Sequence, residues 1–581
     1  MILPDRGRPL NSQTTPLLFQ YLRCDQMHRP PFVIRYGGLM KLSTRASTAL
    51  SVTLVLAIAL ALGMSGPAEA RVVSANASPI GSIVVTKSAA PTARGDIVRR
   101  PNIVVLQTDD QTVQDLSVMP GVRRLIAQRG VTFDQMVTPF PICCPSRAAE
   151  LTGSYPHNNG VNANFPPAGG FVPWEKKSGN KHIGKWLQNA GYYTAHIGKY
   201  INGYAYPNRP KAAVPNGWSE WHGSADPSTY QMWGYRLNEP SGSHKYGSFP
   251  VQNPALYSSD VYGRKAVRII QQQAKRPGPF YLQVEFLAPH VETVPLKKGF
   301  IPQPWVDVDN PDPSTGIQVI PPRPAPRHRN FFNNMPLEMD PSFNEADVSD
   351  KGSFVRNLPL LTPDQITDLV EDNRSRRRSL LAVDEAITKI IRELKKTKQD
   401  RNTVIVMMGD NGYLLGQHRI SMGKYFPYEP ALRIPFMMSG PGIARNRTES
   451  KLVSLVDVAP TLLDLAHAKP SGRAPDGMSL RSALRGVGSP RTRSVLLSSG
   501  PQKGPNGANL PLFDGVRSPN FVWFRYEDGF EEMYDLKNDP YELTSLAYDP
   551  AYSSTRATMI AEWNRLRHCK GTSCQKPTIA P

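Results

Sequence analysis

Two adjacent cysteines, Cys143 and Cys144, are the most distinctive candidates for chemistry in the sequence. They lie in the run Pro-Ile-Cys-Cys-Pro-Ser-Arg, so that a proline stands two residues and Arg147 four residues after Cys143. Adjacent cysteines rarely bridge each other, because the geometry of such a disulfide is strained. A buried pair of thiols before a helix would be the purely structural alternative. The pair therefore needs a role other than a disulfide between its two members.

Two pairs of oxygen-bearing side chains follow apolar runs that are predicted to be buried strands. Asp109 and Asp110 come shortly after the run NIVVLQ, and Asp410 and Asn411 come shortly after the run TVIVMM. In sheets built from alternating strands and helices, ligand-binding groups gather at the carboxyl ends of the strands. The two pairs could therefore meet despite their wide separation in the sequence.

Strands and helices alternate over the first large part of the chain. Besides the two runs above, strands are predicted at 192–197 and 280–287, and helices at 112–129, 182–189 and 377–396. The alternation predicts an α/β fold in which helices cover both faces of a mixed, mostly parallel sheet. Residues 297–354 are rich in Pro, Asn and Asp and are predicted to be an irregular insertion near the site, with disorder as the alternative.

After about Pro475 the chain changes character. Short strands at 522–524 and 532–534 and a helix at 555–567 predict a smaller α+β domain. The predicted domains are therefore 101–475 and 476–581.

The pattern at residues 40–70 is typical of an export signal. Lys41 and Arg45 precede the apolar run 49–64, and Ala68-Glu69-Ala70 fits the small-x-small pattern of cleavage sites. The mature chain would then start near Arg71, be secreted and keep no stable membrane span. An uncleaved anchor is the alternative, although the run is short for a spanning helix. Residues 1–39 are predicted to be an upstream extension, which a misassigned start would explain, and residues 71–100 are predicted to be a linker.

The formal charge of +20 limits the classes of partner only weakly. Residues 1–70 hold seven Lys/Arg and three Asp/Glu, so +16 remains for the rest. A basic surface attracts nucleic acid, anionic membranes or sulfated polymers. The sequence lacks a basic helix interleaved with aromatics and lacks zinc-finger spacing, so we expect no nucleic-acid partner. Cys569 and Cys574 are close enough to form a small disulfide loop, which export would permit.

The cysteine motif, followed by Leu151-Thr152-Gly153, resembles the Cys-x-Pro-Ser-Arg signature of the type I sulfatases. The resemblance implies that a separate maturation enzyme oxidises Cys143, not Cys144, to formylglycine. An aldehyde hydrates to a geminal diol. One hydroxyl can attack sulfur, and deprotonation of the other then expels sulfate and restores the aldehyde. Serine at this position would lack that route of release.

The same resemblance implies a metal site and further site residues. Sulfatases bind Ca²⁺ or Mg²⁺ through an Asp-Asp and an Asp-Asn pair, which match Asp109, Asp110, Asp410 and Asn411, and oxygen ligands favour such hard cations over zinc. Matching motifs name the other candidates: Arg147, Lys199 and Lys424 as sulfate-binding cations, His290 as the acid that protonates the leaving alcohol, and Asn202 and His418 as substrate-binding residues. The histidine that sulfatases often have two residues after the Lys199 position is Ile201 here.

These observations predict a sulfatase with an alkaline-phosphatase-like fold. The substrate would be a sulfated carbohydrate, because the motifs most resemble the N-acetylglucosamine-6-sulfatase group. An aryl sulfate is the other expected substrate. A phosphate or phosphonate ester hydrolase is the enzymatic alternative, since related folds bind both kinds of tetrahedral anion. A glycan-binding protein whose Cys143 is never matured is the non-enzymatic alternative.

Overall fold

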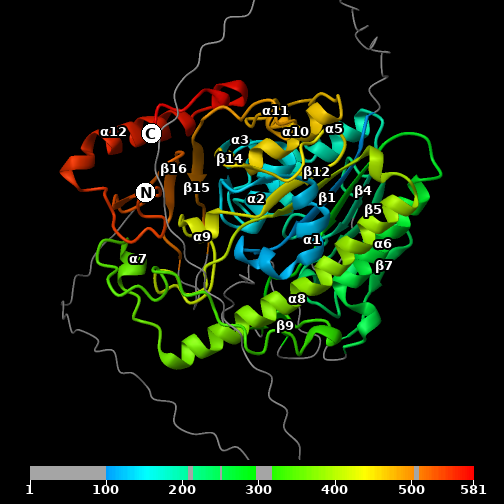
Figure 1. The fold of residues 1–581 in the computed structure, drawn as a ribbon, viewed down its shortest axis with the longest axis horizontal. Helices are drawn as coiled ribbons and strands as arrows, with labels where there is room; N and C mark the ends of the chain where they lie inside the picture. Colours follow the sequence, from blue (N-terminus) through cyan, green and yellow to red (C-terminus); the bar gives the residue numbers. More distant parts are fainter. Residues whose placement is uncertain (1–99, 207–212, 249–251, 296–316, 503–508) are drawn as a thin grey trace, which may run out of the picture. The chain divides into compact units, whose positions relative to one another are not determined.

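The computed structural model describes residues 100–206, 213–248, 252–295, 317–502 and 509–581. Its main element is a ten-stranded sheet. Figure 1 shows the sheet at the centre of the described chain. The strands lie in the order β13 (Arg447–Glu449), β2 (Gly130–Phe133), β12 (Phe436–Ser439), β11 (Thr403–Gly409), β1 (Asn102–Thr108), β8 (Phe280–Glu285), β4 (Tyr193–Gly198), β5 (Glu220–Ser224), β6 (Arg236–Glu239) and β7 (Gly242–Lys245).

The five central strands, from β11 to β5, are parallel to one another. β12 and β6 pair antiparallel at either side of this block, so the sheet is mixed but mostly parallel. β1 and β11 are buried along their whole length, because they are β-branched and apolar runs covered on both faces. The predicted strands at 192–197, 280–287 and 403–408 are confirmed, with shifts of one or two residues.

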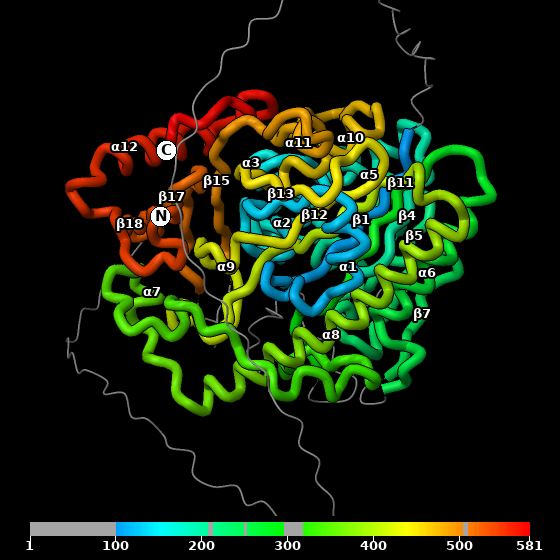
Figure 2. Tube along the Cα trace, in the orientation of Figure 1, coloured from blue at the N-terminus to red at the C-terminus, as the bar shows by residue number. Residues whose placement is uncertain are grey.

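Helices cover both faces of this sheet, and alternate residues of β1 divide between two hydrophobic cores. Val104 and Leu106 pack with α1 (Pro120–Leu125), α6 (Ser258–Gln273) and α8 (Pro363–Lys396). Ile103 and Val105 pack with the helices of the other face, which are α2 (Cys143–Thr152), α5 (Ile183–Asn189) and α10 (Val458–Leu465). Figure 2 shows α6 and α8 side by side along the sheet.

A four-stranded antiparallel sheet forms the smaller C-terminal part. It consists of β15 (Val495–Ser498), β16 (Phe513–Arg517), β17 (Phe521–Tyr526) and β18 (Glu531–Asp535), and α12 (Ser553–Leu566) packs on it. The predicted disulfide between Cys569 and Cys574 is confirmed and follows this helix. The α/β class with a smaller C-terminal sheet is therefore confirmed. The domain boundary at 475/476 stays a prediction.

Short elements connect these layers. They are η1 (Gln114–Val118), η2 (Ala127–Arg129), α3 (Pro156–Asn159), α4 (Phe171–Ser178), η3 (Ser228–Tyr230), α7 (Ser353–Arg356), α9 (Glu429–Leu432), α11 (Arg481–Leu484) and the strand pairs β9–β10 (Glu292–Pro295, Ile317–Ile320) and β3–β14 (Met136–Val137, Val453–Ser454). Described residues 321–352 are mostly irregular, as predicted for that part of the insertion.

Two predicted helices have different bounds in the structure. The region 112–129 is not one helix but three short ones, because Met119 leaves the helical region and Pro120 starts a new helix. α8 begins at Pro363, well before the predicted residue 377, because Thr362 and Gln365 form a capping box there. The predicted extension, signal and linker (1–39, 40–70, 71–100) lie outside the described residues, except Arg100. None of the helices in the described ranges is long and apolar enough to cross a membrane.

Candidate active site

The predicted site residues come together at the carboxyl ends of four neighbouring parallel strands. Asp109 and Asp110 follow β1, and Asp410 and Asn411 follow β11. Lys199 follows β4, while β8 ends in Glu285 and leads to His290. The order and direction of these strands thus bring distant segments to one edge of the sheet, as the sequence predicts.

Cys143 is the first residue of α2 and faces this edge. Its Sγ lies 3.0 Å from Nζ of Lys424 and 3.4 Å from Oδ1 of Asp109. Cys144 instead belongs to the hydrophobic core between α2 and the sheet, and its backbone N–H donates to Asn164 at 3.0 Å. The structure therefore gives the two adjacent thiols different surroundings and leaves only Cys143 among the polar residues.

Arg147 lies one helical turn after Cys143 and joins three strand ends. Its Nη2 lies 3.1 Å from Asp109, its Nε 2.9 Å from Asp410 and its Nη1 2.8 Å from Glu285. All four side chains are buried. Charge-assisted hydrogen bonds in several directions fix the guanidinium plane, so Arg147 sets the relative positions of β1, β8 and β11 at this edge.

The remaining predicted cations and the histidine line the same cluster. Nζ of Lys199 lies 2.5 Å from Oδ2 of Asp109, and Nζ of Lys424 lies 2.6 Å from Oδ1 of Asp110. Nε2 of His290 lies 3.6 Å from Oδ2 of Asp110, while its Nδ1 lies 2.7 Å from the carbonyl oxygen of Val291. That contact places the Nδ1 proton on the backbone side and directs Nε2 to the cluster.

The carboxylates are suited to hold a hard cation. Ligand atoms of Asp109, Asp110, Cys143 and His290 all lie within 4.8 Å of one another. Oδ2 of Asp110 and Oδ1 of Asn411 are buried and accept no hydrogen bond from the described residues. Buried acceptors without donors are costly, and a bound cation would satisfy both. Asp110 also has a positive φ of 64°, a strained backbone for a non-glycine residue of the kind found at functional sites.

The charges within the cluster are balanced by close neighbours. Burial alone would raise the pKa of Asp109, but Lys199, His290 and Arg147 outweigh it and hold that pKa well below its usual range. Burial would lower the pKa of Lys199, and Asp109 raises it instead. Burial, together with Asp109, raises the pKa of the Cys143 thiol well above its ordinary value. The unmodified thiol is therefore a poor nucleophile in these surroundings, because the thiolate is the reactive form.

Three residues that the sequence did not single out support the cluster. Arg376 of α8 donates to the carbonyl oxygens of Asp110 and Pro289, thereby joining the β1 loop to the residue before His290. The carboxylate of Glu285 forms an ion pair with the guanidinium of Arg147. The ring of Tyr230 lies 4.8 Å from Nζ of Lys199 and 5.1 Å from the ring of His290. For Arg376 a signal existed, since three consecutive arginines in an amphipathic helix cannot all face solvent.

The two predicted substrate-binding residues lie in different environments. Asn202 is buried and donates to the hydroxyl of Tyr230 at 2.9 Å, so it adjoins the cluster through that ring. His418 is also buried, with Nδ1 2.6 Å from Oε2 of Glu345 and its ring 4.3 Å from that of Tyr428. These contacts place His418 in the packing beside the Lys424 loop. Substrate binding by both residues stays a prediction.

Comparisons with known proteins agree with this geometry. The family model described as Sulfatase matches residues 101–468, and the one described as N-sulphoglucosamine sulphohydrolase, C-terminal, matches residues 416–569. The chain belongs to the sulfatase family. It is accordingly a sulfuric ester hydrolase, and the resemblance inferred from the cysteine motif is confirmed.

The relatives of this sulfatase, and solved structures of other proteins that resemble it, match most of its length. An arylsulfatase of Volvox carteri is 32% identical over 82% of this chain and 76% of the relative. An N-acetylglucosamine-6-sulfatase of Homo sapiens is 28% identical over 83% of this chain and 87% of the relative, in agreement with the predicted group. A structure described as a complex with its substrate D-glucosamine-2-N,6-O-disulfate has a TM-score of 0.62 at 23% identity and covers 81% of this chain and 98% of its own. That likeness confirms the predicted fold.

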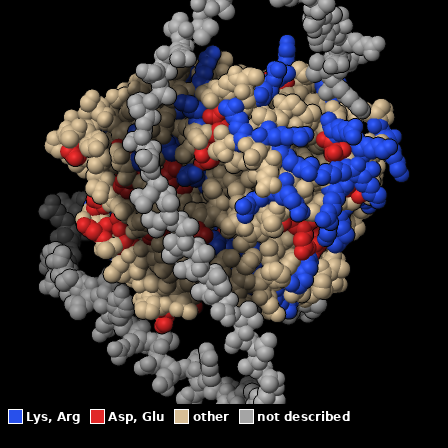
Figure 3. All heavy atoms as spheres, in the orientation of Figure 1, with Lys and Arg blue, Asp and Glu red and all other residues tan. Residues whose placement is uncertain are grey.

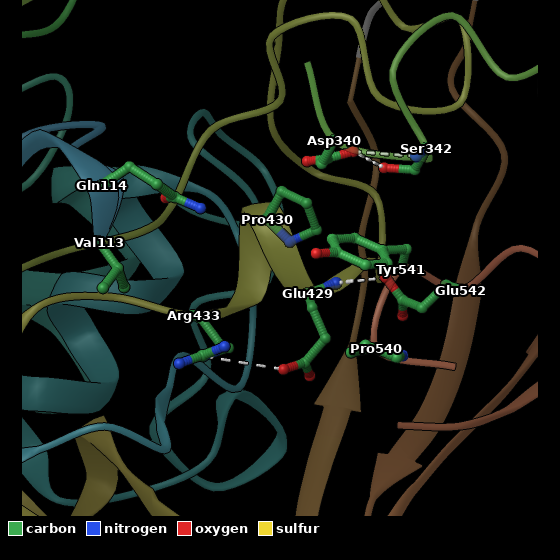
Figure 4. A pocket seen from close by; sticks show the side chains of 10 residues that line it. All are labelled: Val113, Gln114, Asp340, Ser342, Glu429, Pro430, Arg433, Pro540, Tyr541 and Glu542. Atoms are coloured by element: carbon green, nitrogen blue, oxygen red, sulfur yellow. Dashed lines mark hydrogen bonds and ion pairs between the residues drawn. The ribbon is translucent and has the colours of Figure 1, made fainter. Parts of the chain in front are cut away.

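A pocket of about 330 Å³ lies beside α9, and Glu429 of that helix is one of the residues that line it (Figure 4). The backbone N–H of Glu429 donates to Glu542, and its carboxylate lies 2.9 Å from Arg517 of β16. Burial, together with Glu429, raises the pKa of Glu542 well above its usual value. Glu429 therefore links the segment after Lys424 to the C-terminal sheet and has a structural role in this sulfatase.

Proposed function

We propose that this sulfatase hydrolyses the sulfate ester of a sulfated sugar of the glucosamine 6-sulfate type. The observation that carries the mechanism is the position of Cys143, whose Sγ lies at a helix N-terminus and within 3.4 Å of both Lys424 and Asp109. The substrate class is supported by the N-acetylglucosamine-6-sulfatase relatives and by the glucosamine disulfate named for the similar structure.

Formylglycine at position 143 would supply a hydrated aldehyde, with one hydroxyl to attack sulfur and a second to release sulfate afterwards. The chain's own residues prepare that attack. Asp109, within hydrogen-bonding reach of position 143, would hold or accept a proton there. Lys199, Lys424 and the N-terminus of α2 would bind the anionic sulfate group and stabilise the charge that builds on its oxygens.

His290 is proposed as the acid for the leaving sugar oxygen. Its Nδ1 is held by the Val291 carbonyl at 2.7 Å, so the other nitrogen can carry a proton toward the cluster. Tyr230 and Asn202 lie on the Lys199 and His290 side of the cluster and would contact the sugar next to the ester. Arg147 is predicted from its motif to bind sulfate, and that role stays a prediction. We propose that it also positions the site, because all three of its ion pairs go to residues at the strand ends.

A divalent cation, Ca²⁺ or Mg²⁺, would act as a Lewis acid on the ester oxygens. Asp109, Asp110, Asp410 and Asn411 would hold it, since their oxygens form the hard donor set that such ions require. Lys199 and Lys424 now pair with two of these carboxylates. A cation on the carboxylates would therefore leave both ammonium groups to bind an anionic ester beside it.

We also propose that the enzyme acts outside the cytoplasm after export and maturation. The export pattern from Met40 and the disulfide between Cys569 and Cys574 both support this location, because disulfides persist in oxidising compartments. A formylglycine-generating enzyme of the host would be the maturation partner.

Mass spectrometry of the peptide that contains Cys143 tests the mechanism. A mass corresponding to an aldehyde or its hydrate in place of the thiol is the expected result. An intact thiol in the secreted, purified protein would contradict it and favour a glycan-binding role. Turnover of a glucosamine 6-sulfate oligosaccharide, an aryl sulfate and the matching aryl phosphate tests the substrate class. A large preference for the phosphate would favour the phosphoesterase alternative.

A further inference from the structure

A second pocket lies at the edge of the sheet opposite to the candidate active site. It has a volume of about 410 Å³ and is bordered by Asn102, the first residue of β1, and by Asn402, which precedes β11. The end of α6 and the start of β8 form its other side. These are the amino ends of the strands whose carboxyl ends hold the active site. The pocket is therefore separate from the cluster around Cys143.

The lining of this pocket is suited to an anion. Three cationic side chains, Arg100, Arg276 and Lys398, line it together with four amide side chains, and none of the described lining residues is acidic. Gln273 is only 6% exposed, and its Nε2 donates to no acceptor among the described residues. A buried donor without a partner destabilises the protein, and a bound anionic oxygen would satisfy it.

A basic surface surrounds the pocket and extends along three helices, which we call the basic helical face. Figure 3 shows Lys and Arg gathered over the side of the molecule that α1, α6 and α8 occupy. The exposed basic residues there are Arg123, Arg124, Arg129, Arg264, Arg268, Lys275, Arg276, Lys389, Arg392, Lys395, Lys396, Lys398 and Arg401. Glu393 and Asp400 of the stretch 389–401 are buried or half-buried, and Asp260 and Asp384 nearby are buried. The exposed acidic residues of α8, which are Asp364, Asp368 and Glu371, lie toward its other end.

Compensation of helix dipoles does not account for this distribution. Basic residues are favoured in the last turn of a helix, which covers Lys395 and Lys396 of α8. Arg264 and Arg268 of α6 and Lys389 of α8 lie before the last turns and are exposed as well. Like charges concentrated on one face repel one another, so an extended anionic partner would relieve that repulsion.

The end of the basic helical face that borders the pocket is too far from Cys143 to act on the sulfate that is hydrolysed. Arg376 of α8 contacts the Asp110 loop, whereas Lys396 ends the same helix twenty residues later. At a rise of 1.5 Å per residue, the two lie roughly 30 Å apart along the helix. One ligand can reach both places only if it is a long chain that carries several anionic groups.

We propose that the pocket at Gln273, Arg276 and Lys398, with the basic helical face around it, is an exosite that binds a distal stretch of a sulfated polysaccharide. The inference rests on the proposed function, because a sulfated sugar chain is the polyanion that this enzyme would meet as substrate. The pocket would take one sulfate or carboxylate group, and the surrounding cations would follow the chain. The exosite would thereby raise the affinity for polymers without touching the ester that reacts.

Two sets of variants test the exosite in the full-length, matured enzyme. The triple variant Arg276→Gln/Lys396→Gln/Lys398→Gln removes two charges that line the pocket and one charge of the basic helical face beside it. The control Lys469→Gln/Arg491→Gln/Lys537→Gln removes three charges from exposed positions elsewhere. We expect the first to weaken binding of heparin, a sulfated polysaccharide, by roughly tenfold at constant salt, since exposed pairs each contribute a modest amount. The control should change it less than twofold.

Gln273→Met separates the pocket from general charge, because it removes the buried donor and leaves the net charge unchanged. It should weaken heparin binding by roughly twofold to fivefold. Turnover of a small aryl sulfate should be the same in every variant, while the KM for a sulfated polysaccharide rises in the triple variant. Titration with sodium sulfate tests whether the pocket is instead a site for free sulfate. If free sulfate saturated the pocket and polymer bound no more tightly, the exosite for a polysaccharide would be overturned.

Equal losses in the triple variant and its control would overturn the exosite, because net charge alone would then explain binding. A larger loss for duplex DNA or for phosphatidylserine vesicles than for heparin would overturn the choice of partner. Failure of the proposed function would be seen in turnover and not in heparin binding. No variant, nor the unaltered enzyme, would then turn over either sulfate ester, although the heparin comparison could still be made.

Discussion

The ammonium group of Lys424 lies 3.0 Å from the sulfur of Cys143, although 281 residues separate them in the sequence. The contact joins the start of α2 to the loop that follows β11. Cys143 thus has a polar environment, whereas its neighbour Cys144 packs into the hydrophobic core. The geometry of the helix start therefore distinguishes Cys143, the proposed reactive position, from Cys144.

Replacement of each cysteine should give opposite results. Cys143→Ala should lower kcat for an aryl sulfate by roughly 10³-fold or more, since loss of a nucleophile has effects of that size or larger. Cys144→Ala should keep most of the activity and lose about 1–2 kcal/mol of stability, because it removes a buried atom from the core. Steady-state rates and thermal unfolding of both variants check this. Retained activity in Cys143→Ala would disprove its assignment as the nucleophile.

Addition of Ca²⁺ should stabilise the protein after treatment with a chelator. A ligand that binds only the folded state at a hundredfold its Kd adds about 2.7 kcal/mol, so the unfolding midpoint should rise by several degrees. Asp110→Asn should abolish most of that rise, because Asp110 contributes a buried oxygen that no described donor satisfies. Asp340→Asn, which alters a carboxylate of the separate pocket beside α9, is the matched control. Equal responses of the two variants would contradict the metal assignment.

Arg376 should behave as a positioning residue for the site. Arg376→Met removes the hydrogen bonds to the carbonyl oxygens of Asp110 and Pro289, and we expect kcat to fall roughly 10- to 100-fold. Arg376→Lys should restore part of the loss. Arg374→Met, a half-buried neighbour on the same helix, is the control.

A merely structural role for Arg376 would lower the unfolding midpoint and leave the Ca²⁺ affinity unchanged. A positioning role should weaken Ca²⁺ binding, since the Asp110 backbone is the segment that Arg376 holds. Isothermal titration of Ca²⁺ into both variants distinguishes these outcomes.

The sequence predicted the parts of the site that depend on local patterns. Apolar runs that end in Asp109-Asp110 and in Asp410-Asn411 have a strong strand signal, and parallel pairing of β1 with β11 brings their ends together. The long helix and the paired cysteines near the C-terminus were predicted for similar local reasons. The fold class followed from the alternation of strands and helices.

Tertiary packing decided what the sequence could not predict. Tyr230 reaches Lys199 and His290 from a short helical turn that follows β5, and no local pattern marks it. His418 is predicted from its motif to bind substrate, and the structure shows it in a buried position next to Glu345 of the insertion, which no local pattern predicts. Such contacts depend on which loops pack over the strand ends, and the sequence around each residue does not contain that information.

Glu285 belongs to a buried network beneath Arg147, and its protonation should affect stability. Burial raises the pKa of Glu285 to about 7 despite the nearby Arg147 guanidinium. The folded state therefore binds this proton more tightly than the unfolded state. The resulting stabilisation is complete below the unfolded pKa, near 4.5, and is lost as the pH rises through about 7.

Glu285→Gln should remove this dependence, because glutamine resembles the protonated acid and cannot titrate. The stability of the variant relative to the unaltered enzyme should therefore increase as the pH rises from 5 to 7, by about 1.4 kcal/mol per pH unit at most. The exposed Glu371→Gln should show no such trend. Denaturant unfolding at several pH values measures both. A constant difference across this range would show that Glu285 is already ionised at pH 5, and that its pairing with Arg147 outweighs its burial.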